Sequence, residues 1–195
     1  MTVAMTIAFA YLDWLCCNNF VIDRAGFTGV EIGILQSVRE IPGFLAFTAV
    51  FVLLIIREQF FAYLSLALLG IGVAIAGYFP SAIGLYLTTF LMSVGFHYFE
   101  TVKQSLSLQW LSVDEAPKVL GQLIAAGSIA SLLVYSCLWL FQGYFGVSYE
   151  AIYIFGGGLC LTLTVWTWAV FPRFESTVVQ RKNLVLRNAI GFIML

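Results

Sequence analysis

One segment of the sequence, residues 81–111, is long enough to cross a membrane as a helix and also carries a row of polar side chains. At 1.5 Å per residue such a helix is roughly 45 Å long, which exceeds the roughly 30 Å hydrocarbon core of a bilayer. Because unpaired polar groups in lipid cost several kcal/mol, we expect the polar face to point at protein or at a watery cavity. The side chains that share this face are Thr89, Ser93, His97, Glu100 and Gln104.

The composition places the whole chain in a membrane. Of its residues 62% are apolar and 10% are charged, whereas soluble domains have about 45–50% and about 25%. We therefore expect the lipid bilayer as its surroundings. No basic run predicts nucleic acid as a partner. Because the sequence contains no zinc, phosphate-loop or haem motif, we expect no cofactor and no bound metal.

The apolar runs predict an all-α, polytopic membrane protein with six transmembrane helices. Turn-forming glycines, charged residues and prolines separate these runs. Within the fifth and sixth spans, Gly127 with Ser131 and the triplet of residues 156–158 predict close helix packing. We expect residues 1–172 to form the bundle and residues 173–195 a basic cytoplasmic segment. The predicted spans cover residues 2–21, 30–56, 60–79, 81–111, 119–141 and 151–171.

The positions of Lys and Arg predict that both ends of the chain are cytoplasmic. With this orientation, the outer loops carry only Arg24, which lies beside Asp23. The inner loops and the C-terminal segment carry all of the following: Arg57, Lys118, Arg173, Arg181, Lys182 and Arg187.

Two charges are predicted near the middle of the bilayer. Asp13 lies about 16 Å from the inner end of the first span, and Arg39 lies about 15 Å from the outer end of the second. A lone charge at that depth is costly, so we predict that Asp13 and Arg39 pair. The pair is either part of a substrate or proton site, together with Glu40, or a structural link. Pro42 predicts a kink in the second span at the same depth.

The C-terminal part of the polar face contains a second group of candidates. His97 and Glu100 are three residues apart, which would let them relay a proton along one helix face. The alternative is a hydrogen bond between helices. Lys103 is interpreted as a residue that extends to the inner membrane interface.

Six spans, short loops, cytoplasmic ends and a basic segment after the sixth span resemble the N-terminal half of a major facilitator superfamily transporter. Residues 26–35, which read GFTGVEIGIL, look like the family's outer connection into its second helix. Residues 181–195 look like the linker and the first residues of a seventh helix. Two signatures differ. The family's inner loop motif is reduced to Arg57 and Glu58, and the Gly-Pro pair of family antiporters is absent from the fifth span.

The resemblance implies a secondary active transporter, not an enzyme, in a bacterial inner membrane. It implies a small-molecule substrate, with proton coupling as an option, and a second six-helix half or a homodimer as partner. Two alternatives stay open, namely an intramembrane acid–base enzyme that uses His97 with Glu100 or Asp13, and a membrane scaffold without transport. The candidate residues for a substrate or proton path are Asp13, Arg39, Glu40, His97, Glu100 and Gln104.

Overall fold

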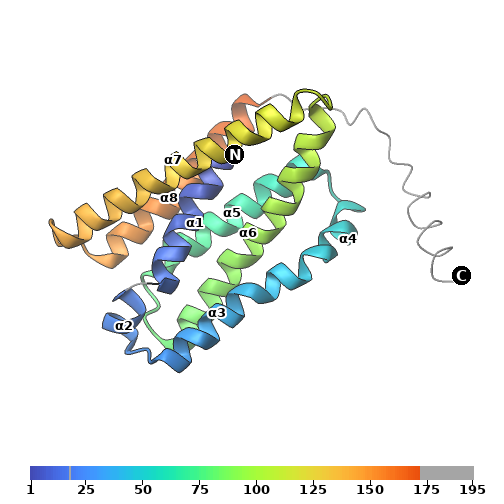
Figure 1. Cartoon of the computed structure of the whole chain (residues 1–195). Coiled ribbons are helices and arrows are strands. Elements are labelled where there is room, and N and C mark those ends of the chain that lie inside the picture. Colours follow the sequence, from blue (N-terminus) through green and yellow to red (C-terminus); the bar gives the residue numbers. More distant parts are fainter. Residues whose placement is uncertain (18, 172–195) are drawn as a thin grey trace, which may run out of the picture.

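The computed structural model describes residues 1–17 and 19–171, and this part of the chain is all-helical (Figure 1). Short turns join most of its consecutive elements, as the sequence predicts. In order, they are α1 (Thr2–Cys17), α2 (Asn19–Ala25), α3 (Gly29–Phe44), the 3-10 helix η1 (Leu45–Thr48), α4 (Ala49–Leu53), α5 (Glu58–Ala76), α6 (Ala82–Trp110), α7 (Ala116–Gly143) and α8 (Tyr149–Val170).

In the part of the chain that the structure describes, five helical segments are long and apolar enough to cross a membrane, which indicates an integral, multi-pass membrane protein. The prediction of an all-α chain with several long apolar helices is therefore confirmed. The five segments are Gly29–Leu53, Glu58–Ala76, Ala82–Ser107, Ala116–Gly143 and Tyr149–Val170.

The first predicted span, residues 2–21, differs from these five segments. The structure describes α1 and α2 on either side of residue 18, which lies outside the described part, and the apolar helix Thr2–Leu15 is shorter than the five others. A sixth transmembrane helix therefore stays a prediction. The predicted basic segment, residues 173–195, lies outside the described residues.

Helix α5 lies at the centre of the bundle and is the most buried of the long helices. It packs against α6 on one side and α8 on the other, while α3 covers α6 and α7 covers α1. Figure 1 shows α5 and α6 between the α7–α8 pair and the α3–α4 segment. Helix α7 and the α3–α4 segment are the least buried, so they form the outer faces of the described bundle.

Glycine allows α5 and α8 to approach closely. A side chain on Gly157 of α8 would overlap the α5 backbone at Gly70 and Ala74, so only a hydrogen fits there. On α7, Gly127 is buried against Thr6 of α1. Both contacts confirm the close packing that small residues predict in the fifth and sixth spans.

The α3 helix is interrupted near its proline. Pro42 is buried inside α3, and regular α-helix ends two residues later, at Phe44, directly before η1 begins at Leu45. Proline has no N–H to donate to the preceding turn, and its ring crowds that turn. The change of helix type thus occurs close to the position where the sequence predicts a kink.

Candidate functional site

A group of four polar side chains, which we call the charged cluster, joins three helices. It consists of Asp13, Arg39, Glu40 and Tyr135. Arg39 Nη1 donates to Asp13 Oδ1 at 3.3 Å, and Arg39 Nε donates to Glu40 Oε1 at 3.1 Å. Tyr135 donates its hydroxyl hydrogen to Asp13 Oδ2 at 2.9 Å. The predicted pairing of Asp13 with Arg39 is confirmed.

The members of the charged cluster differ in exposure. The side chain of Arg39 is 20% exposed, that of Asp13 is 35% exposed and that of Glu40 is 61% exposed. Most of the surface of the Asp13 and Arg39 side chains is therefore covered by protein, whereas most of the Glu40 side chain is exposed. Since α1, α3 and α7 contribute Asp13, Arg39 and Tyr135, the contacts fix α1 between the two other helices.

Tyr135 is a residue that the sequence analysis missed. Its signal is its position, because it lies well inside the apolar α7 helix while tyrosines of membrane helices are enriched near the two interfaces. A tyrosine at mid-depth needs a hydrogen-bond partner for its hydroxyl. Here that partner is the carboxylate of Asp13.

The first half of the polar face of α6 packs against α3. Thr89 and Ser93 are fully buried, and the Ser93 hydroxyl donates to the backbone carbonyl of Arg39. His97 lies against Gly43 of α3, where an added methyl group would come within 2.8 Å of the imidazole. This part of the face points at protein, as we expect from the cost of exposing polar groups to lipid.

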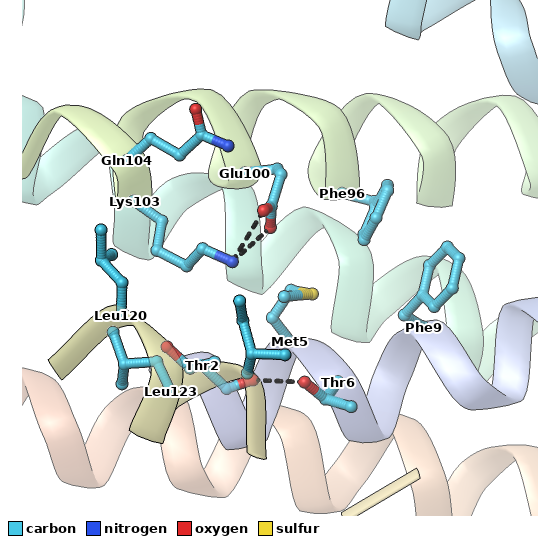
Figure 2. A pocket seen from close by; sticks show the side chains of 11 residues that line it. Thr2, Met5, Thr6, Phe9, Phe96, Glu100, Lys103, Gln104, Leu120 and Leu123 are labelled. Carbon is cyan, nitrogen blue, oxygen red and sulfur yellow. Dashed lines mark hydrogen bonds and ion pairs between the residues drawn. The ribbon is translucent and has the colours of Figure 1, made fainter. Parts of the chain in front are cut away.

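The second half of the same face turns toward α1 and α7 (Figure 2). Lys103 Nζ donates to both carboxylate oxygens of Glu100, at 2.6 and 2.7 Å. The side chains of Lys103 and Glu100 are 19% and 33% exposed. Lys103 is thus bound by an acid on its own helix. Glu100, which the sequence pairs with His97, is bound to Lys103.

A cavity of about 470 Å³ lies between α1, α6 and α7. Figure 2 shows Glu100 and Lys103 pointing into it from α6. Its volume falls within the range of roughly 300–1,000 Å³ that small-molecule sites occupy. Besides Glu100 and Lys103, its walls are formed by Thr2, Met5, Thr6 and Phe9 of α1, Phe96 and Gln104 of α6, and Leu120, Leu123 and Ile124 of α7.

Two stacked rings line the part of the cavity nearest the charged cluster. The ring centroids of Phe9 and Phe96 are 4.2 Å apart, and the ring planes differ by 24°. Phe9 lies one helical turn before Asp13, and Phe96 directly precedes His97. The aromatic pair therefore lies between the cavity and the charged cluster.

Comparison of the chain with known protein families, curated proteins and solved structures found no match. Its function is therefore inferred from its own residues. Within residues 1–17 and 19–171, no group of three or more His, Cys, Asp or Glu side chains could hold a metal ion. The six candidate residues form two groups: Asp13, Arg39, Glu40 and His97 near α3, and Glu100 and Gln104 at the cavity.

Proposed function

We propose that the chain is a secondary active transporter of the major facilitator type, which moves a small solute across a membrane. The observation that supports this most is the charged cluster. Asp13 and Arg39 lie within apolar helices and are held by a third helix through Tyr135, and Phe9, one turn before Asp13 on α1, lines the cavity. Ionisable groups at membrane depth are costly, and they commonly mark ion or substrate pathways.

The proposal includes proton coupling through Asp13. Its carboxylate accepts hydrogen bonds from Arg39 of α3 and Tyr135 of α7. Neutralising the charge of Asp13 would weaken both contacts and so loosen the attachment of α1 to α3 and α7 at this side chain. Because α1 also forms one wall of the cavity, a proton on Asp13 and a solute in the cavity bias the same helix.

The proposal includes the surroundings of the bundle. We place the chain in a bacterial inner membrane with six spans, both ends in the cytoplasm, and a second six-helix half or a second copy beside it. The two least buried segments, α7 and α3–α4, carry many exposed apolar side chains that suit lipid or such a partner.

The two alternatives differ in their support. An acid–base enzyme would use His97 with Glu100 or Asp13, yet these carboxylates are bound by Lys103 and by Arg39 with Tyr135. A scaffold would use the same contacts only to join helices. An experiment must therefore distinguish transport from scaffolding.

The test is uptake of a panel of labelled small solutes by cells that express the whole gene, with and without a pH gradient. We expect uptake of at least one solute that depends on the gradient. The double variant Asp13→Asn with Arg39→Gln should reach the membrane in normal amounts and lose this uptake. The control Asp114→Asn alters an exposed loop carboxylate and should keep it. Unchanged uptake by the double variant, or no uptake of any solute by the unaltered protein, would contradict transport through this cluster.

A further inference from the structure

We infer that the cavity between α1, α6 and α7 binds a molecule with an apolar body and a zwitterionic head, which carries one positive and one negative charge. The inference deepens the proposed function, since this molecule would be the transported solute. It concerns binding, however, and is therefore testable without transport.

The charged residues of the cavity wall are the first observation that supports this inference. Among the described residues that line the cavity, only Glu100 and Lys103 are charged, and they pair with each other at 2.6 Å. The net charge of the wall is therefore zero, although both signs are present. The remaining polar lining residues, Thr2, Thr6 and Gln104, are neutral.

The pairing selects against ligands with a single charge. An anion could pair with Lys103 only by displacing Glu100, which would leave that carboxylate unpaired beside a mostly apolar wall. A cation would leave Lys103 unpaired in the same way. Leaving one partner of an ion pair without its counter-charge is costly when both side chains are mostly covered by protein, as Lys103 and Glu100 are at 19% and 33% exposed. A zwitterion avoids this cost, because its anionic group can bind Lys103 while its cationic group binds Glu100.

The rest of the lining favours an apolar body next to that head. Phe96 lies one turn before Glu100 on α6, about 6 Å along the helix axis. A ligand whose head contacts Glu100 therefore has its body against the stacked rings of Phe96 and Phe9. Leu120, Leu123 and Ile124 of α7 add further apolar surface. This combination of a mostly apolar wall with a few fixed polar groups is typical of small-molecule sites.

Two kinds of molecule that can reach a membrane protein combine a zwitterionic head with an apolar body. One is a free apolar α-amino acid, whose ammonium and carboxylate are attached to the same carbon as its side chain. The other is the head group of a zwitterionic phospholipid that enters from the bilayer. Both offer paired opposite charges beside apolar carbon, so separate arms of one experiment must distinguish them.

The experiment measures the melting temperature of the full chain in an uncharged detergent as probe concentration increases. The probes are L-leucine, its anionic analogue N-acetyl-L-leucine and its cationic analogue L-leucinamide, at about pH 6, where α-amino groups are protonated. A fourth arm uses dihexanoyl phosphatidylethanolamine. We expect L-leucine or the phospholipid to raise the melting temperature saturably, with a half-saturating concentration about tenfold or more below that of either charged analogue.

Single-charge variants make the test sharper. Glu100→Gln leaves a free cation and should switch the preference to N-acetyl-L-leucine. Lys103→Gln leaves a free anion and should switch it to L-leucinamide. The control Glu115→Gln alters an exposed loop carboxylate outside the cavity and should keep the preference for zwitterions.

Three results would overturn the inference: no stabilisation by either zwitterion, equal stabilisation by a singly charged analogue, or an unchanged preference in both variants. These results are separable from a failure of the proposed function. Binding of a zwitterion that is never taken up would contradict transport and keep this site, whereas uptake of singly charged solutes alone would keep transport and overturn this site.

Discussion

At the scale of single residues, the carboxylate of Asp13 joins three helices because each of its oxygens has its own donor. Oδ1 accepts from Arg39 and Oδ2 accepts from Tyr135. An ionised carboxylate bound on both sides holds its helix more strongly than one contact would. The loss of Asp13 should therefore affect the contacts of α1 with both α3 and α7.

The coupling of Asp13 and Arg39 is measurable in a double-mutant cycle. We expect Asp13→Asn and Arg39→Gln each to lower the free energy of unfolding by about 2–3 kcal/mol, below the 3–5 kcal/mol of fully buried pairs because Asp13 is one third exposed. The double variant should lose less than the sum of the two single losses. Unfolding of the purified protein in denaturing detergent gives the three values. Strict additivity would show that the residues are not coupled.

The hydroxyl of Tyr135 has its own test. Tyr135→Phe removes one hydrogen bond to an ionised group and keeps the ring, so we expect a loss of about 2 kcal/mol in the free energy of unfolding. The matched control is Tyr144→Phe, at the end of α7, where the tyrosine is 79% exposed and the same change should have almost no effect. Equal losses in both variants, measured by the same unfolding assay, would contradict a specific role for the contact with Asp13.

A contact between two residues could be predicted where their depth in the membrane or their spacing along one helix determines it. Asp13 and Arg39 have similar depths on adjacent spans, and this predicts their pairing correctly. Tyr135 lies on α7, far from α1 in the sequence, and helix periodicity does not show which side chain of another helix it meets. The contact of Glu100 with Lys103 could have been predicted from the sequence, because their spacing of three residues places them on neighbouring positions of one helix.

At the scale of helices, one part of the polar face of α6 contacts α3 and another part lines the cavity. The sequence predicts the shared face from the spacing of Thr89, Ser93, His97, Glu100 and Gln104 but cannot say what covers it. In the structure α3 covers the part around Ser93 and His97, while the part from Glu100 onward faces the cavity.

Two neighbouring glycines of α8 test how helix packing is achieved. Gly157→Ala would force a methyl group into the α5 backbone, so we expect a loss of about 1–3 kcal/mol in stability. Gly158→Ala meets nothing within 4 Å and should gain up to about 1 kcal/mol from higher helix propensity. Thermal unfolding of the two variants should therefore shift in opposite directions. A destabilised Gly158→Ala protein with an unaffected Gly157→Ala protein would contradict the observed approach of α5 and α8.

At the scale of the whole molecule, the cavity and the charged cluster lie on opposite sides of the Phe9–Phe96 ring pair. Phe96 is fourteen residues from each end of α6, so it lies near the middle of the bilayer if α6 crosses it. In a transporter this depth must be reached from both faces of the membrane in turn. In a scaffold it would be reached from one face or from neither.

The most direct measurement is therefore the labelling of Phe96→Cys by a membrane-impermeant thiol reagent, in a variant whose four natural cysteines are replaced. Ser148→Cys and Ser112→Cys, both in exposed connections, serve as references that should label only from outside and only from inside, respectively. We predict that Phe96→Cys reacts from both faces and that a transported solute slows its reaction. Labelling of Phe96→Cys from a single face under every condition, with both references behaving as expected, would contradict the account.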